Sequence, residues 1–298
     1  MSVLAIFGPT ASGKSAVAEA IAKRFQAELV SADSMQVYRG LPVLTNQSGG
    51  RTHLVGIWPL EHEGSVGEYE RLAHETIDGI LERGRTPVVV GGTGLYLRAA
   101  LADLEIPPRP RPGVRERFDS LYEERGAEAA HAALAERDPA AAADVHPNDR
   151  RRVVRALELA ELGSSLRRSD ARLWTDETRH PTTIFGLELP RELLHRRIDE
   201  RTRRMFELGV VGEVRRALSR PLSSTARQIL GLREVAELPR DEAVEALVVA
   251  TRRFAAYQQK WMRRMPGLVP VRGDRPAEEV AAEILAAVQA HTTAEPAG

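Results

Sequence analysis

The segment that most constrains the fold of this chain is a glycine-rich loop near the N-terminus, Gly8–Ser15, which reads GPTASGKS. It matches the pattern G-x-x-x-x-G-K-[ST] at every fixed position. An apolar run, Val3–Phe7, precedes the loop, and Lys14–Phe25, with apolar residues at helical spacing, follows it. Because the pattern lies between a predicted strand and a predicted helix, it predicts a phosphate-binding loop rather than a fortuitous glycine turn.

The residue types in the loop explain how it would bind an anion. Backbone N–H groups converge on phosphate oxygens at the start of the following helix, whose dipole favours negative charge. Lys14 supplies a compact positive charge, and Ser15 supplies a hydroxyl ligand for Mg²⁺. Only three of the 42 basic residues are lysines, so a lysine at this position stands out. We expect phosphate contacts from the whole loop: Gly8, Pro9, Thr10, Ala11, Ser12, Gly13, Lys14 and Ser15.

Strand and helix signals alternate over the first hundred residues. Apolar runs at Leu29–Ala32 and Pro87–Val90 are separated by a helical pattern at Tyr69–Arg83. This order predicts an α/β fold: a P-loop-containing parallel sheet flanked by helices, with ligands at the carboxyl ends of its strands. Asp33 and Thr93 lie just past two of those ends.

The middle of the chain has a different composition. A proline-rich stretch at 106–113 can form neither a helix nor a central strand, and an alanine-rich segment with helical signals follows it. We predict a small all-helical insertion domain at 113–178. The P-loop core would then consist of residues 1–112 and 179–298.

The predicted core resumes after the insertion. Strand signals occur at Thr183–Leu189 and Leu268–Val271. Helical signals run from Pro190 to about Leu208, over Asp241–Met265, and from Pro276 onward.

Composition excludes several classes of protein. The 298 residues include no cysteine, which excludes disulfides, thiolate catalysis and Cys-ligated zinc. No apolar run approaches the roughly 18–20 residues of a membrane span, and no basic segment precedes the first apolar run. We therefore expect a cytoplasmic protein with no membrane partner. The 42 basic and 42 acidic residues balance, but nucleic-acid binding depends on where the charges lie.

Asp33 is the candidate catalytic residue that the sequence pattern itself provides. The strand ending at Val90 is followed by Gly91–Gly94 (GGTG), without the acidic residue that a kinase or ATPase usually places there for its metal. Asp33 is thus the carboxylate expected to face the loop, as a magnesium ligand or a general base. The alternative is a turn or capping role for Asp33 and a simple turn role for Thr93.

Six segments together are more specific than the loop alone. They are Gly8–Ser15, Ser31–Gly40 (SADSMQVYRG), Val90–Tyr96 (VGGTGLY), His146–Glu158 (HPNDRRRVVRALE), Gln228–Glu234 (QILGLRE) and Thr251–Arg263 (TRRFAAYQQKWMR). In this order and spacing they resemble the tRNA dimethylallyltransferase family, also called tRNA isopentenyltransferase, of the bacterial type. The resemblance extends from about Leu4 to Met265.

The resemblance implies transfer of a dimethylallyl group from dimethylallyl diphosphate to N6 of the adenine 3′ of the tRNA anticodon, with release of diphosphate. It implies Mg²⁺, ligated by Ser15, and no need for a nucleoside triphosphate. The loop and Arg201 would bind the diphosphate, with Arg197 as the alternative to Arg201. Asp33 would accept the amine proton, and Thr93 would form a hydrogen bond near the reacting groups.

The same resemblance implies contacts to the anticodon stem-loop of tRNA, whose bases can leave their stack for protein readout. The implied tRNA-binding residues are Asp33, Ser34, Met35, Gln36, Thr93, Arg115, Arg151, Arg152, Arg155, Gln228, Gly231 and Arg233. We expect a monomer.

Two interpretations other than prenyl transfer remain open. A phosphotransferase or ATPase would use the same loop, and a non-catalytic nucleic-acid-binding module would leave the loop and Asp33 unexplained.

Clusters of basic residues at 150–155 and 252–264 indicate either phosphate contacts or ion-paired surface. An aromatic stripe in the second cluster, Phe254, Tyr257 and Trp261, is interpreted as core rather than as a stacking platform. Leu41–Asn46 and Ala256–Tyr257 depart from the family pattern, so local substrate contacts there stay undefined.

Overall fold

The computed structural model describes residues 2–47, 50–104, 106, 113–166 and 173–294. The chain forms two compact units, one of residues 1–102 and 178–298 and the other of residues 103–177. The proline-rich stretch that we predicted as a linker lies largely outside the described residues. The second unit begins at Asp103, whereas the sequence pattern placed the start of the insertion at Gly113.

The larger unit contains a six-stranded, wholly parallel sheet with the order β3-β2-β4-β1-β5-β6. The strands are β1 (Val3–Phe7), β2 (Ala27–Ala32), β3 (Thr52–His53), β4 (Thr86–Gly91), β5 (Thr182–Glu188) and β6 (Leu268–Arg272). All are predicted by apolar runs except β3, which is too short to give a pattern. The central strand β1 pairs with β4 on one side and β5 on the other, so the two parts of the larger unit join at this strand.

Two helices cover one face of the sheet. Helices α1 (Lys14–Arg24) and α12 (Ala277–Ala294) pack together over alternate side chains of the strands, including Ile6, Val88 and Phe185. Alternate positions point to one face because side chains in a strand have a period of two. Helices α2 (Val66–Glu82) and α3 (Gly94–Leu101) also pack against β2 and β4. Helix α3 follows Thr93 at once and was not predicted.

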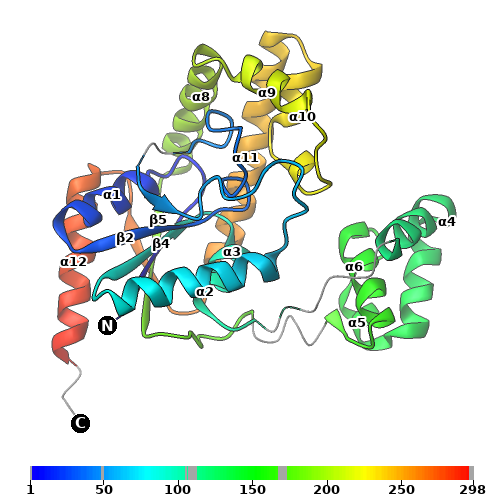
Figure 1. Ribbon diagram of the computed structural model, residues 1–298, viewed down its shortest axis with the longest axis horizontal. Coiled ribbons are helices and arrows are strands. Elements are labelled where there is room, and N and C mark those ends of the chain that lie inside the picture. Colours follow the sequence, from blue (N-terminus) through cyan, green and yellow to red (C-terminus); the bar gives the residue numbers. More distant parts are fainter. Residues whose placement is uncertain (1, 48–49, 105, 107–112, 167–172, 295–298) are drawn as a thin grey trace. The chain divides into compact units, whose positions relative to one another are not determined.

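The remaining helices of the larger unit are α8 (Arg191–Glu207), α9 (Val210–Leu218), α10 (Leu232–Glu237) and α11 (Arg240–Arg264), with a 3₁₀ turn at Ala226–Gln228 (Figure 1). The predictions for α8 and α11 agree with the structure to within about a residue at each end. Helices α9 and α10 were not predicted. No helix in the described part of the chain combines the length and apolar character that crossing a membrane requires.

The smaller unit is helical, as the sequence indicated. It contains α4 (Val114–Arg137), α5 (Pro139–Asp144) and α6 (Arg150–Glu161), and α4 is interrupted by non-helical backbone at Gly126. Asp138 and Asp149 cap α5 and α6 by accepting hydrogen bonds from Ala141 N and Arg152 N. The helices enclose their own apolar core, which includes Phe118, Leu134, Val153 and Leu157. The unit therefore has a core independent of the sheet.

Candidate functional site

The glycine-rich loop connects β1 to α1 at the carboxyl end of the sheet. Gly8 N donates to Gly91 O at 3.3 Å, which ties the start of the loop to the end of β4. A Cβ atom at Gly8 would lie 2.7 Å from Ser12 Oγ, so the close approach requires glycine. Gly13 caps α1 in the left-handed region, with φ 92°, and no side chain caps this helix. The first N–H groups of α1 thus have no side-chain cap, which is the arrangement that binds phosphate.

Two arginines of α8 reach this loop. Arg201 Nη2 donates to Thr10 Oγ1 at 2.6 Å, and Arg197 Nη1 donates to Ser12 O at 3.3 Å. Arg201 also buries its Nε without a hydrogen-bond partner in the described part of the chain. The sequence proposed Arg201 with Arg197 as the alternative, and the structure brings both to the loop. An anion bound at the loop would satisfy this buried donor of Arg201.

Electrostatics link Lys14, Arg201 and Asp33. Burial lowers the pKa of Lys14 from 10.5 to about 8; the negative charge of Asp33 opposes this shift and the positive charge of Arg201 adds to it. Burial also lowers the pKa of Arg201, again opposed by Asp33. The three groups are therefore near neighbours. Two cations and one carboxylate leave an excess of positive charge for a phosphate group.

Asp33 follows β2, and one of its carboxylate oxygens organises the local turn. Asp33 Oδ1 accepts hydrogen bonds from Met35 N at 2.9 Å and Gln36 N at 3.3 Å. The turn role considered from the sequence is thus present. Both of these bonds use Oδ1, so they leave Oδ2 for other chemistry.

Thr93 lies beside this turn because β2 and β4 are paired neighbours, with Ala32 opposite Gly91. Thr93 caps α3 but makes no side-chain hydrogen bond to that helix. Its Oγ1 instead accepts from Ser34 N at 3.3 Å and shares a hydrogen bond with Ser34 Oγ at 3.3 Å. Thr93 therefore links the turn that follows β4 to the turn that follows β2, and the simple turn role considered from the sequence does not describe it fully.

A pocket opens beside the phosphate loop between α1 and the sheet. Its lining combines the loop lysine and serine, the Asp33 carboxylate and several strand-end residues: Lys14, Ser15, Glu19, Leu29, Ser31, Asp33, Gln36, Thr52, Val90 and Gly91. The lining supplies hydroxyl and carboxylate oxygens, which are the ligand types that Mg²⁺ prefers. No group of three or more His, Asp or Glu side chains in the described residues could hold a metal without other ligands.

Helix α11 supplies residues that the sequence analysis did not assign. Gln258, only 2% exposed, accepts a hydrogen bond from Thr10 N at 2.7 Å through Oε1. A Cβ at Gly92 would lie 2.3 Å from Gln258 Nε2, and one at Gly94 would lie 2.3 Å from the Trp261 ring. Helix α11 therefore packs against both the phosphate loop and the Thr93 turn. In the sequence, Gln258 and Trp261 belong to one of the six segments, and Trp261 also belongs to the aromatic stripe that was interpreted as core.

Gln36, predicted to bind tRNA, directs its amide group into the protein. Its Oε1 accepts from Ser31 Oγ at 3.0 Å, and its Nε2 donates to Thr45 O at 3.2 Å and Asn46 O at 3.0 Å. The buried Glu213 of α9 also accepts from Val43 N and Leu44 N, both at 2.9 Å. The divergent segment Leu41–Asn46 is thus held in place from two sides.

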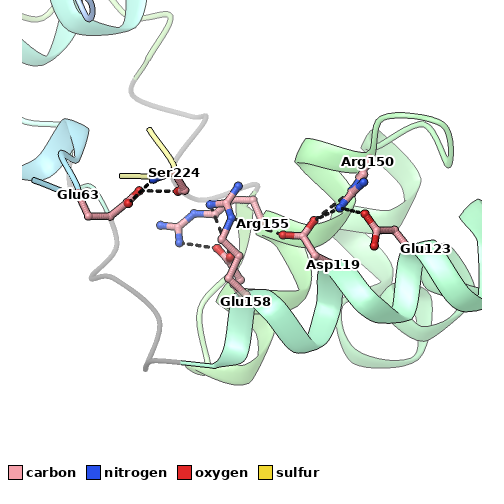
Figure 2. Close-up of polar contacts among 8 residues, drawn as sticks. Glu63, Asp119, Glu123, Arg150, Arg155, Glu158 and Ser224 are labelled. Carbon is pink, nitrogen blue, oxygen red and sulfur yellow. Dashed lines mark hydrogen bonds and ion pairs between the residues drawn. The ribbon is translucent and has the colours of Figure 1, made fainter. Parts of the chain in front are cut away.

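Gln228, Gly231 and Arg233 lie around the 3₁₀ turn and the start of α10. Gln228 and Arg233 are exposed, whereas Gly231 is buried with φ 89°. The preceding residues are tied to the loop before α2. Glu63 accepts from Ser224 N at 2.8 Å and from Ser224 Oγ at 2.6 Å (Figure 2), and Thr225 Oγ1 bonds to the Tyr38 hydroxyl at 2.6 Å.

Two of the four arginines in the predicted basic cluster of the helical unit, Arg150 and Arg155, form ion pairs. Arg150 pairs with Asp119 at 2.7 Å and Glu123 at 2.8 Å (Figure 2). Glu158, whose side chain is fully buried, pairs with Arg155 at 3.0 Å and Arg115 at 3.7 Å. Arg151 and Arg152 are exposed. The ion-paired alternative therefore describes Arg150 and Arg155 of this cluster. Arg115, which lies outside the cluster, is paired as well, and these pairs reduce the positive charge available to an RNA backbone.

The prediction for the aromatic stripe of α11 was wrong at one position. Tyr257 is 55% exposed, while Phe254 and Trp261 are partly buried. The other basic cluster is also less uniform than its sequence indicated, because Arg252 forms a bidentate pair with Asp199 on α8.

Comparison with known proteins gives consistent matches. The family model described as IPP transferase matches residues 36–265, and one described as isopentenyl transferase matches residues 1–53. The tRNA dimethylallyltransferase of Streptomyces coelicolor is 42% identical over 277 residues, covering 89% of this chain and 88% of the relative. That of Corynebacterium jeikeium is 37% identical over 286 residues, covering 92% of each.

Solved structures extend the similarity to the fold. The tRNA isopentenylpyrophosphate transferase of Bacillus halodurans matches with a TM-score of 0.69 and 30% identity, covering 98% of both chains. A eukaryotic dimethylallyltransferase acting on tRNA matches with a TM-score of 0.78, covering 99% of this chain and 80% of that one. At 24% identity this second likeness supports the fold alone.

Proposed function

We infer that this chain, which belongs to the IPP transferase family, is a tRNA dimethylallyltransferase. It transfers the dimethylallyl group of dimethylallyl diphosphate to N6 of the adenine 3′ of the tRNA anticodon and releases diphosphate. The observation that supports this reaction best is the placement of one carboxylate, Asp33, next to Lys14 and Arg201 at the mouth of a phosphate loop.

The difficult step is departure of the diphosphate. The bond between C1 of the dimethylallyl group and the diphosphate oxygen breaks, and its electron pair leaves with the diphosphate. Lys14, Arg201 and the N–H groups at the start of α1 stabilise the negative charge that develops there. Burial makes each of these charges more effective, because a low local dielectric strengthens electrostatic interactions.

We propose that Mg²⁺ is held by the Ser15 hydroxyl together with oxygens of the diphosphate. A site with few protein ligands suits this cation, which usually keeps several waters and binds through substrate phosphates. When bound, it neutralises further charge on the leaving group.

The N6 amine then forms a bond to C1 and loses a proton. Asp33 accepts that proton, and general base catalysis of this kind contributes roughly 10²–10⁴ in rate. Thr93, joined to the Asp33 turn through Ser34, orients the reacting amine. The fixed turn holds the carboxylate in place, because Oδ1 is bonded to two backbone N–H groups.

The substrate RNA would be an anticodon stem-loop with the target adenine out of its stack. Five residues of the predicted tRNA-binding set are exposed, and we propose that they contact this RNA: Arg115, Arg151, Arg152, Gln228 and Arg233. We propose that the enzyme acts as a monomer in the cytoplasm, and light scattering of the purified protein tests the first part.

A phosphotransferase or ATPase is not favoured. Strand β4 ends at Gly91 and is followed by Gly92 and Thr93, without the acidic residue that such enzymes usually place there. The relatives of similar length are also named for prenyl transfer.

The decisive assay mixes protein, Mg²⁺ and unmodified tRNA with either labelled dimethylallyl diphosphate or ATP. Label on adenine from the first donor supports the proposal, whereas ATP turnover without prenyl transfer contradicts it.

Asp33→Asn tests the proposed base. The asparagine keeps an oxygen that can accept the two turn hydrogen bonds, so tRNA affinity should stay within about twofold. Transfer should fall by roughly 10²–10⁴. Asp274→Asn, at a partly buried aspartate after β6 that pairs with Arg272, is the matched control. Near-normal turnover of Asp33→Asn would remove Asp33 from this role.

A further inference from the structure

The ring of Tyr257 is an exposed aromatic surface on α11. The residue is 55% exposed, compared with 47% for Phe25, the other exposed aromatic residue in the described part of the chain. It makes an edge contact with Trp261, with ring centroids 6.5 Å apart and an interplanar angle of 71°. Trp261 packs in turn on Gly94, where an added Cβ would lie 2.3 Å from its ring. The tyrosine ring is therefore supported from one side and open to solvent.

The segment of α11 that carries this ring packs against the Thr93 turn. Gln258, the following residue, contacts Gly92 and receives the Thr10 N–H of the phosphate loop. Gln258 and Trp261 thus contact the residues on either side of Thr93. A base stacked on Tyr257 would therefore lie on the helix segment that packs against the Thr93 turn.

Positive charge flanks the ring on the same helical face. Arg253 and Lys260 lie four residues before and three residues after Tyr257, positions that are neighbours on a helix surface. Both are exposed, and neither takes part in an ion pair among the described residues. Arg252 differs, because it is neutralised by Asp199.

Proteins that bind single-stranded nucleic acid combine exposed aromatic rings with positive charge, because a base stacks on the ring while the neighbouring phosphates contact the cations. We propose that Tyr257 is a stacking platform for an unpaired base of the RNA substrate, with Arg253 and Lys260 contacting the adjoining phosphates. This proposal rests on the proposed function and adds a substrate-binding residue to it. A partner protein would be expected to cover a wider apolar area than one ring.

The test measures binding of an unmodified anticodon stem-loop by fluorescence anisotropy at several salt concentrations. Tyr257→Ala should raise Kd about 5- to 100-fold, the range expected for loss of one stacked base. Tyr257→Phe should bind like the wild type, because the ring and not the hydroxyl carries the interaction. Phe25→Ala, at an exposed aromatic residue that ends α1 at its far end from the loop, is the matched control and should not change Kd.

Salt dependence separates stacking from charge. The slope of log Kd against log salt should be unchanged in Tyr257→Ala and should fall by about 1 in Lys260→Ala. The KM for dimethylallyl diphosphate and the melting temperature of Tyr257→Ala should match those of the wild type.

Three results would overturn the stacking role: unchanged affinity in Tyr257→Ala, a Tyr257→Phe variant as weak as the alanine variant, or a loss accompanied by a changed salt slope or melting temperature. Wild-type protein that transfers no dimethylallyl group to tRNA would instead contradict the proposed function. The two failures are therefore distinguishable.

Discussion

The lowered pKa of Lys14 predicts that this residue destabilises the fold that it serves. Its pKa in the folded protein is about 8, against 10.5 for an unperturbed lysine, because burial disfavours the charged form. Each pKa unit corresponds to 1.36 kcal/mol, so a charged Lys14 costs about 3 kcal/mol at pH 7. Replacing it with an uncharged side chain of similar shape, Lys14→Met, should remove this cost.

The sign and the pH range follow from proton linkage. Between pH 8 and 10.5 the unfolded chain binds more protons at this site than the folded chain, so stability rises with pH in that window. The cost is fully present below pH 8 and declines to about 1 kcal/mol at pH 10. Lys14→Met should therefore stabilise the protein strongly at pH 7 and only slightly at pH 10.

Differential scanning calorimetry at the two pH values measures this difference. For a unit of this size, 1 kcal/mol shifts the melting temperature by about 2–4 °C, so the gain should be about 6–12 °C at pH 7 and about 2–4 °C at pH 10. Prenyl transfer should be lost in the same variant. Lys23→Met, at an exposed lysine of the same helix, should shift the melting temperature little at either pH. An unchanged or lower melting temperature for Lys14→Met at pH 7, or a gain independent of pH, would refute the reasoning.

Two further substitutions test contacts that stabilise each unit separately, one within the larger unit and one within the helical unit. Gln258→Leu leaves Thr10 N without its acceptor, so calorimetry should show that the larger unit loses roughly 1–3 kcal/mol of stability. Initial-rate assays should show a lower kcat/KM for dimethylallyl diphosphate. The control Gln259→Leu should change neither quantity. Glu158→Ala removes the buried partner of Arg155 and should lower the stability of the helical unit by roughly 1–3 kcal/mol in the same calorimetric scans. Glu158→Gln keeps an acceptor for Arg155 and should retain most of that stability, and equal losses in both variants would argue against the contact.

Much of the sheet could be predicted because its strands are buried on both faces and appear as short apolar runs. Asp33 and Thr93 could be placed at the carboxyl edge for the same reason. Their direct proximity depends on the pairing of β2 with β4, which the strand order determines and a linear pattern does not. Helix α3 escaped prediction because its first residue, Gly94, continues a glycine-rich turn.

The residues missed by sequence analysis act through long-range contacts. Gln258 reaches the loop across 248 positions, and no local pattern announces such a pair. Exposure of Tyr257 was mispredicted for a related reason. Helical spacing identifies residues that share a face, but the packing of neighbouring elements decides which of those residues are buried.

The position of β1 between β4 and β5 affects how the protein can mature on the ribosome. The first hundred residues include the phosphate loop, yet one edge of β1 stays unpaired until the strand at Thr182–Glu188 has been made. The loop gains Arg201 and Gln258 later still. Nascent chains released before that point would carry the recognisable motif but expose an open apolar edge, and would be substrates for chaperones or proteases rather than partial enzymes.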